Sequence, residues 1–521
     1  MRLPLQSETA RSLPHRSCTS ILVGGLAKTA AAFMLVAAIG WADPVRVSPV
    51  NPHYFIFNEK PLVLITSDHH YGAVIDKDFD FARFLEYLSR QGMNLTRIYP
   101  GGMFEAPDKY IPGNPLGPRP GRQILPWAKS AQAGAHPALA EPGQPSYKYD
   151  LDRWNPDYFT RLRAFVELAG EKGIIVEAAF FNGMYADCWP LMAMYHGNNI
   201  QNVGGYEAED CGLFTTADSR NEGVLRYQKA YVAKITTELN GFDHVIFDLC
   251  DEPSLAGRMD GSILNLPDSQ VEPWLQALKE AFLEAEARLP KKHLLGQTIQ
   301  NLSPDLSGES WCAWLPTEYV RPAGIALEKN YGANKPIVDV ESDYFGVGLV
   351  KPYSPEDVRV EGWWFMLGGG AGFINLNGEY CRGQESGGRV TQEKIVPQKK
   401  VLRDFIESFD FVRMARFTHF SGMPSDAFAS AIAEKGKQYG LYLFHGASDG
   451  KWGAHFIAKA GSYRDTITLS AVPAGNYQLE WLDPATGTVK ETKSLKWSGG
   501  DLAVTTPEYS IDAALRMRAR L

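Results

Sequence analysis

The apolar positions of this chain gather into eight short runs separated by longer amphipathic stretches. Runs of this length, rich in β-branched and aromatic residues, predict buried strands. In the stretches 79–92 and 155–173, apolar residues recur at i, i+3 and i+4 and the segment ends at a glycine, which predicts helices. The predicted strands are 61–67, 93–99, 173–181, 244–249, 293–299, 311–315, 336–341 and 372–377.

Strands that alternate with helices predict an α/β protein, here a (β/α)8 TIM barrel over residues 43–426. A doubly wound open sheet is the alternative, but "SDHHYG" follows the first strand where such a sheet would carry a glycine-rich phosphate loop. From Ala427 the pattern changes to short alternating runs bounded by turn signals. We therefore expect a small antiparallel β-sandwich domain over residues 427–521.

The first 42 residues are set apart by their pattern. Basic residues precede the apolar run "TAAAFMLVAAIG", and small residues occupy the positions expected of a cleavage site before Asp43. This pattern predicts a signal peptide over residues 1–42 and a secreted or periplasmic protein. We expect no membrane insertion after signal cleavage, because the apolar run is short for a bilayer.

Composition and charge narrow the class of partner. The 521 residues are 45% hydrophobic, enough for a large core, and the formal net charge is −8 without a long block of like charge. Neither nucleic acid nor an anionic membrane is indicated, and a neutral substrate suits this balance. The oligomeric state stays open.

The cysteines show no metal-type spacing, so we expect no structural metal and no cofactor. An exported chain would keep an odd number of them, which leaves at least one unbridged. The pair that flanks the polar stretch after the third strand, Cys188 and Cys211, is predicted to form a disulfide. The others are Cys250, Cys312 and Cys381.

Two glutamates end predicted strands. Glu252 follows the fourth strand and Glu341 closes the seventh. In a barrel both would lie at the carboxyl ends of strands, across the mouth from one another. Two facing carboxyl groups are what cleavage of a glycosidic bond requires. The long insertions 100–149 and 182–220 follow the second and third strands and are expected to form walls of the cleft.

These motifs resemble a known group of enzymes. "FDLCDEP" and "VDVES" are similar to the acid/base and nucleophile signatures of clan A glycoside hydrolases, the cellulase-like and apiosidase-like barrels with a C-terminal β domain. The resemblance implies a retaining glycoside hydrolase that acts on a neutral oligo- or polysaccharide. Glu341 would be the nucleophile, held ionised by Arg97 of "GMNLTRI", and Glu252 the acid/base. Asp251 stands where the clan usually has an asparagine that binds the sugar 2-hydroxyl.

Further residues near strand ends are candidates for contacts with a sugar through hydrogen bonds or stacking. An aromatic residue packs in a core more often than it binds a ligand, so each of these residues also has a purely structural interpretation. The candidates are His70, Asn182, Trp314, Tyr344 and Asn377.

Two other functions remain as alternatives. Asp68 and His70 share one face after the first strand, as ligands of a metal-dependent hydrolase would. Further ligands are lacking there, because His244 and His293 fall at the beginnings of strands, the opposite end of a barrel. A non-catalytic carbohydrate-binding protein would bind sugar without hydrolysing it, and Glu252 and Glu341 would then be ordinary carboxylates of the rim.

Overall fold

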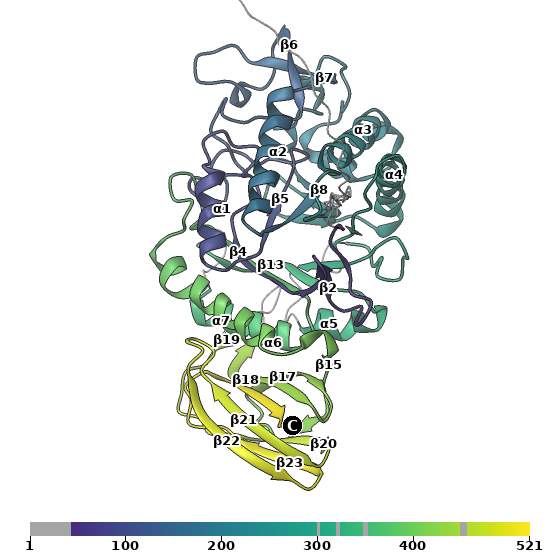
Figure 1. Cartoon of the computed structure of the whole chain (residues 1–521). Coiled ribbons are helices and arrows are strands. Elements are labelled where there is room, and N and C mark those ends of the chain that lie inside the picture. Colours follow the sequence, from purple (N-terminus) through teal and green to yellow (C-terminus); the bar gives the residue numbers. More distant parts are fainter. Residues whose placement is uncertain (1–42, 300–302, 319–323, 347–352, 449–455, 521) are drawn as a thin grey trace, which may run out of the picture. The chain divides into compact units, whose positions relative to one another are not determined.

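The computed structural model describes residues 43–299, 303–318, 324–346, 353–448 and 456–520 (Figure 1). The predicted signal peptide lies outside these residues and stays a prediction. The helices are α1 (Phe81–Arg90), α2 (Pro156–Glu171), α3 (Glu222–Leu239), α4 (Asp268–Ala287), α5 (Gly324–Asn330), α6 (Pro355–Leu367) and α7 (Val396–Glu407). The strands up to α7 are β1 (Arg46–Val47), β2 (Phe55–Phe57), β3 (Lys60–Leu62), β4 (Leu64–Asp68), β5 (Leu95–Ile98), β6 (Trp127–Ala133), β7 (Tyr147–Trp154), β8 (Ile175–Tyr185), β9 (Val245–Gly257), β10 (Ile263–Asn265), β11 (Leu295–Gly296), β12 (Leu315–Glu318), β13 (Ile337–Phe345) and β14 (Gly372–Asn377).

Eight of the described strands follow one another as a TIM barrel would order them. They are the predicted strands, and they form two parallel sheets, β5-β8-β9-β11 and β12-β13-β14-β4. One prediction is shifted along the chain: the sixth strand begins at Leu315, where the predicted strand ends. The α/β fold class is confirmed, and within each sheet the strands follow the order expected of a TIM barrel.

Side chains and single bridges join the two sheets where the ladders stop. Between β4 and β5, the Asn94 side chain donates to Val63 O at 2.8 Å and accepts from Ile65 N–H at 2.9 Å. Between β11 and β12, isolated parallel bridges pair Gly296 with Trp314 and Ile299 with Thr317. A continuous ladder around the barrel is therefore not seen in the described residues.

An apolar cluster fills the barrel at the amino-terminal ends of its strands. It contains the first or second residues of several barrel strands, among them Leu64, Leu95 and Ile246. Phe55 of β2 belongs to the same cluster, so the small β1–β3 sheet covers the end of the barrel opposite the mouth. This plug keeps water from the bottom of the barrel and leaves the carboxyl ends of the strands as the open face.

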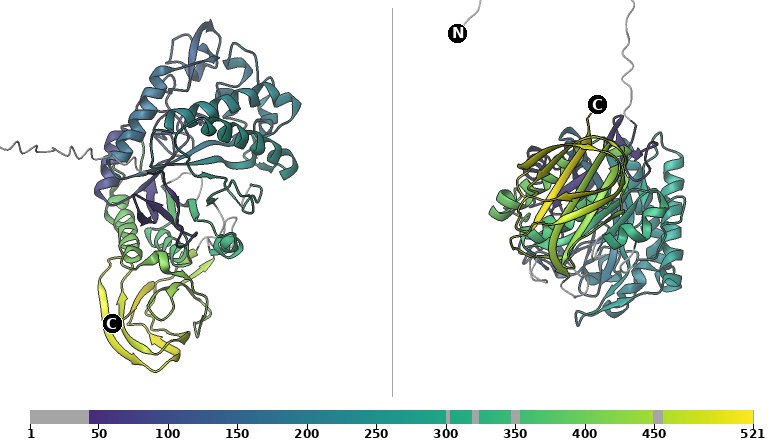
Figure 2. Two further views of the ribbon diagram at one scale, coloured as in Figure 1. Left: turned by 45° about the vertical axis from the view of Figure 1, so that its right-hand side comes forward. Right: turned by 90° about the horizontal axis from the view of Figure 1, so that it is seen from below.

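After α7 the chain forms antiparallel sheets, drawn in green to yellow in Figure 2. Their facing apolar side chains make a separate core that includes Leu441, Leu469 and Leu515. This arrangement is consistent with the expected β domain. The strands are β15 (Ala415–Arg416), β16 (Phe420–Ser421), β17 (Ala427–Glu434), β18 (Gln438–Ser448), β19 (Phe456–Ala458), β20 (Thr466–Val472), β21 (Gly475–Leu482), β22 (Val489–Trp497), β23 (Gly500–Thr505) and β24 (Asp512–Ala519).

Helix α6 packs against the barrel and the C-terminal strands at once. Its Trp363 shares one buried cluster with Phe373 of β14 and with Tyr442 of β18. Beside it, buried Arg359 donates from Nε and from a terminal nitrogen to the two carboxylate oxygens of Asp512 on β24, at 2.8 and 3.1 Å. Such a bidentate pair fixes orientation as well as distance. Among the described helices, none has the length and apolar character needed to span a bilayer.

The Arg359–Asp512 pair gives a test of this junction. Replacing Arg359 by Met should lower the free energy of unfolding by about 3–5 kcal/mol, because Asp512 then stays buried without its counter-charge. Replacing both residues, Arg359→Met with Asp512→Leu, should recover most of the loss. Urea unfolding of each variant measures the effect, with Lys400→Ala, which removes an exposed helix pair with Asp404, as the control. Equal losses in the single and double variants would contradict this account.

Candidate active site

A cavity of about 380 Å³ opens at the carboxyl ends of the barrel strands and contains both predicted catalytic glutamates. Glu252 is 5% exposed and Glu341 is 7% exposed, so each reaches the cavity with little more than its carboxyl group. Both long insertions contribute to the wall, as expected. The first supplies Met103, Glu105, Lys109, Tyr110 and Leu116, and the second supplies Tyr185 and Asp187.

A bulge in β9 aims Glu252 into this cavity. Asn182 of β8 pairs with Asp251 and Met184 pairs with Ala256, so β9 advances by five residues between these pairs while β8 advances by two. Within the bulge Glu252 has φ of 43°, the left-handed conformation that a glutamate seldom adopts. A side chain at Gly183 would collide with the carbonyl of Glu252, which explains the glycine. The bulge breaks the alternation of side chains along β9 at Glu252.

Glu318, at the end of β12, holds this bulge and was not predicted as a site residue. Its Oε1 accepts the backbone N–H of Glu252 at 3.2 Å. The side chain is 1% exposed, and burial together with the charge of Asp251 raises its pKa well above the usual range. Glu318 therefore keeps its proton and hydrogen-bonds Asp251. The signal that could have identified Glu318 is its position at the carboxyl end of a barrel strand. It was missed because the sixth strand was predicted to end at Leu315.

Arg97 of β5 lies below the cavity and is fully buried among acidic side chains. Its guanidinium is 3.0 Å from Glu177, 2.9 Å from Asp251 and 3.4 Å from Asp248. The fourth carboxylate, Glu341, is the most distant at 3.6 Å. The contact between Arg97 and Glu341 that the resemblance implies is present, but the arginine is shared.

Because four acidic side chains share Arg97, the arginine does not favour the ionised form of each of them equally. Burial opposes ionisation of Asp251, but Arg97 and hydrogen bonds from Glu318, Arg97 and Tyr99 outweigh it, and the pKa of Asp251 is lowered. For Glu341, burial and then the charge of Asp251 raise the pKa to about 8 against the effect of Arg97. Burial and the charge of Asp251 thus oppose the ionisation of Glu341 that the resemblance implies, and Arg97 favours it.

Two other predicted residues reach the cavity, and a third supports it from behind. His70 lines the cavity, and burial lowers its pKa to about 3, so it is a neutral hydrogen-bonding group. Asn182 also lines it and donates to the Tyr99 hydroxyl at 3.3 Å. Asp251 is absent from the lining and accepts hydrogen bonds from Arg97 and Tyr99. Asp251 thus contacts Arg97 and Tyr99 and does not line the cavity.

The remaining predicted sugar contacts are not brought to the cavity. Trp314 is fully buried in the apolar plug at the opposite end, because the sixth strand begins one residue after it. Asn377 is fully buried and donates to the hydroxyl oxygens of Ser67 and Thr391, at 3.0 and 2.8 Å. Both predictions are corrected to structural roles. The side chain of Tyr344 lies outside the described residues.

The predicted disulfide is absent, and Cys188 and Cys211 are both free thiols. Cys188 Sγ accepts from Lys109 Nζ at 3.6 Å, while the Cys211 thiol donates to two backbone carbonyls of the barrel mouth, each at 3.4 Å. Each sulfur is thus buried against different partners. The polar stretch between the two cysteines is held by other contacts, so flanking a loop was a poor guide to pairing.

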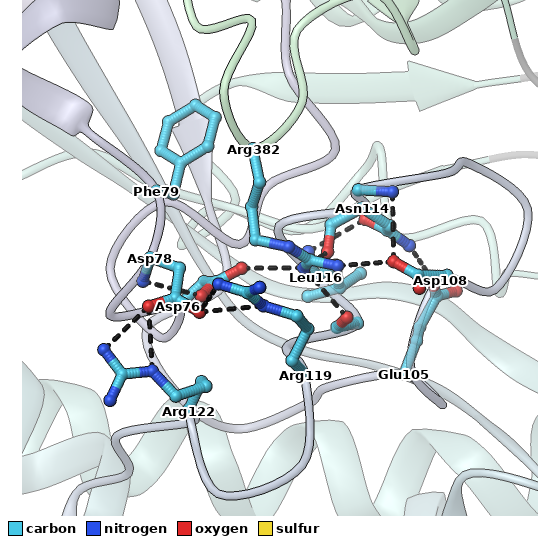
Figure 3. A network of polar contacts seen from close by, with 12 residues as sticks. Asp76, Asp78, Phe79, Glu105, Asp108, Asn114, Leu116, Arg119, Arg122 and Arg382 are labelled. Carbon is cyan, nitrogen blue, oxygen red and sulfur yellow. Dashed lines mark hydrogen bonds and ion pairs between the residues drawn. The ribbon is translucent and has the colours of Figure 1, made fainter.

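A network of ion pairs fixes the first insertion as a wall. Figure 3 shows the guanidinium of Arg382 between Asp76 and Asp108. It also donates to the carbonyl of Asn114 at 2.6 Å, and the Asn114 side chain donates to Glu105 at 2.7 Å. Burial raises the pKa of Glu105 to about 8. The network therefore holds a largely protonated carboxyl group at the edge of the cavity.

One group of described residues has the spacing of a metal site. An oxygen from each of Asp251, Glu318 and Glu341 lies within 4.8 Å of the other two. The cation of Arg97 already contacts two of them, and protonated Glu318 donates a hydrogen bond to Asp251, so the negative charge of the group is balanced without an ion. The predicted alternative pair is not assembled, because Asp68 accepts from the backbone N–H of Arg97 and does not line the cavity with His70.

The buried carboxyl groups predict how stability depends on pH. Burial raises the pKa of Glu105, Glu177 and Glu341 to about 8 and that of Asp248 to about 7. A raised carboxyl pKa means that the folded state binds protons that the unfolded state has released, so stability falls as pH rises from about 5 to about 8.

Glu177→Gln should make this fall shallower by up to about 1.4 kcal/mol per pH unit, the contribution of one proton. Urea unfolding at pH 5, 6, 7 and 8 measures the slope, and the exposed Glu167→Gln is the control. A stability that rises over this range, or an unchanged slope in Glu177→Gln, would contradict the assignment.

Comparisons with known proteins agree with the fold. No protein-family model matches the sequence, and no curated protein matches it. Among solved structures, a glycoside hydrolase superposes with a TM-score of 0.57 at 11% identity, covering 92% of this chain and 97% of that one. A family 5 glycoside hydrolase from Bacteroides vulgatus gives 0.58 at 10% identity, with 91% and 94% covered. A second structure from that organism, described as a putative glycoside hydrolase, gives 0.57 at 13%, with 92% and 82% covered. The chain therefore has the fold of these glycoside hydrolases, in agreement with its resemblance to clan A.

Proposed function

We propose that this protein is a retaining glycoside hydrolase that cleaves the bond between a neutral sugar and its leaving group. The observation that carries the proposal is that Glu252 of β9 and Glu341 of β13 line one cavity. Two carboxyl groups on such a cavity supply the acid and the nucleophile of a double displacement. From the leader of the sequence we also infer that the enzyme acts outside the cytoplasm.

In the first step a carboxylate oxygen of Glu341 attacks the anomeric carbon, and the bond from that carbon to the leaving oxygen breaks. Glu252 gives its proton to the leaving oxygen. In the second step Glu252 takes a proton from water, whose oxygen attacks the same carbon and releases Glu341. Each carboxyl group ends as it began, so no other reactant is needed.

Glu341 suits the role of nucleophile better than Asp251 does. Asp251 is ionised, but it is 1% exposed and stands behind the cavity surface with Arg97. Glu341 reaches the cavity. In the free enzyme the negative charge of Asp251 raises the pKa of Glu341, because a second negative charge so close to the first is unfavourable. Turnover should thus depend on the fraction of Glu341 that has lost its proton.

Replacing each glutamate should separate the two roles. Glu341→Gln should abolish turnover on every substrate, because the amide cannot form the glycosyl-enzyme. Glu252→Gln should lower kcat about 10²–10⁴-fold on unactivated glycosides but retain cleavage of nitrophenyl glycosides, which need no proton. Azide should restore turnover of the second variant and give a product of retained configuration.

The rates are measured on a panel of nitrophenyl pyranosides and furanosides. Nuclear magnetic resonance of the product gives its configuration. Glu286→Gln is the matched control, since Glu286 is a buried glutamate that accepts from His293 at the start of the barrel strands. Sugar binding without hydrolysis would identify a non-catalytic carbohydrate-binding protein, and an inverted product would exclude the double displacement.

The shared arginine predicts the pH profile. In the unaltered enzyme kcat/KM should rise with pH through about 8, the pKa of Glu341, because only the ionised carboxylate attacks. Asp251→Asn removes the neighbouring charge and frees Arg97, and both changes lower the pKa of Glu341. The rise should then move to lower pH by about one unit or more. Glu286→Gln should leave the profile in place, and an upward shift in Asp251→Asn would disprove the coupling.

A further inference from the structure

Beyond the catalytic bulge, β9 continues out of the barrel and pairs with β10 to form a hairpin over residues 255–265. Leu255, Ala256 and Gly257 pair with Asn265, Leu264 and Ile263 in antiparallel register. A tight turn closes the hairpin, in which Arg258 N–H donates to Ser262 O at 2.8 Å and Gly261 adopts φ of 81°. A barrel strand needs no such extension, so the hairpin calls for a separate explanation.

The hairpin is unusual in the apolar residues that it exposes. Met259 is 65% exposed, Ile263 is 46% exposed and Leu264 is 43% exposed, although most large apolar side chains of the described residues are buried. Two of these three, Met259 and Ile263, line the cavity together with Leu255. Exposed apolar residues that gather at one cavity indicate a binding surface rather than chance.

The position of the hairpin identifies the part of the substrate that it faces. The acid/base must reach the oxygen of the leaving group, and Glu252 belongs to the strand that runs directly into the hairpin. The leaving group therefore extends from Glu252 along this hairpin. Most of the groups that can bind sugar hydroxyls come from other elements, namely His70, Glu105, Lys109, Asn182 and Asp187, while the hairpin itself contributes Arg258 and Ser262.

We propose, building on the glycosidase function above, that the β9–β10 hairpin forms a leaving-group subsite for an aromatic aglycone. Leu255, Met259 and Ile263 supply apolar contact area, and a thioether sulfur makes favourable contacts with aromatic rings. Arg258 also lines the cavity, and a guanidinium attracts the face of an aromatic ring. The hydrogen-bonding side chains of the hairpin that line the cavity are Arg258 and Ser262, and the Ser262 hydroxyl already donates to Asp260, so the apolar residues favour an aromatic ring over a second sugar.

The test compares leaving groups of similar acidity on one sugar, the one that the nitrophenyl panel shows to be cleaved. Ethyl, benzyl and naphthylmethyl glycosides all release simple alcohols, so differences in rate report binding and not activation. We expect kcat/KM to rise about tenfold or more from ethyl to naphthylmethyl, from the apolar area buried. The double variant Met259→Ser with Ile263→Ser should lose most of this preference through KM, with a much larger loss on the naphthylmethyl than on the ethyl glycoside.

Val489→Ser is the matched control, because Val489 is 42% exposed on β22 and does not line the cavity. Three outcomes would overturn the proposal: no preference for the larger ring, an equal loss on all three glycosides in the double variant, or faster cleavage of a disaccharide of the same sugar than of the naphthylmethyl glycoside. Failure of the unaltered enzyme to cleave any glycoside would instead refute the proposed function itself, and the subsite with it.

Discussion

One buried arginine determines the electrostatics of the barrel. Arg97 lies within 3.6 Å of Glu177, Asp248, Asp251 and Glu341, so a single positive charge faces four acidic side chains. Ionising all four inside the protein would leave a large uncompensated charge, which burial makes costly. The barrel therefore retains protons. Asp251, which the arginine contacts most closely, is the one that gives its proton up.

The shape of the site depends on a departure from regular strand geometry. A regular β9 would place Asp251 and Glu252 on opposite faces. The bulge removes that constraint, and Glu318 accepts the N–H that the bulge frees from the ladder. The adjacent carboxyl groups can thus have different tasks, Asp251 with the arginine and Glu252 in the cavity. The strained backbone at Glu252 is held by its surroundings, as is common at functional sites.

The sequence allowed the strand order and the central residues to be predicted, because buried parallel strands are continuous apolar runs. Glu252 and Glu341 were proposed from their positions at the ends of these runs, and Arg97 from the resemblance to clan A. Glu318 was missed because the sixth strand was predicted to end at Leu315, where the strand of the structure begins. For the same reason Trp314 was expected near the mouth and is found at the bottom.

Other features could not be predicted because they depend on contacts between distant segments. The sequence shows that Cys188 and Cys211 flank one loop, but not that Lys109 and backbone carbonyls occupy their sulfurs. The raised pKa of Glu341 could not be predicted for the same reason. Its raised pKa arises from burial and from Asp251, which is ninety positions earlier in the chain, and no local pattern records that neighbour.

The cluster that α6 shares between the barrel and the C-terminal strands couples folding to binding. Because Trp363 packs with Phe373 on one side and Tyr442 on the other, neither half can lose its structure without exposing apolar surface of the other. We therefore expect the two halves to unfold as one cooperative unit. A ligand in the cavity would lower the free energy of the folded state alone, so it would also protect sheets that it never touches from unfolding. The C-terminal strands would in this sense take part in the response of the protein to a ligand.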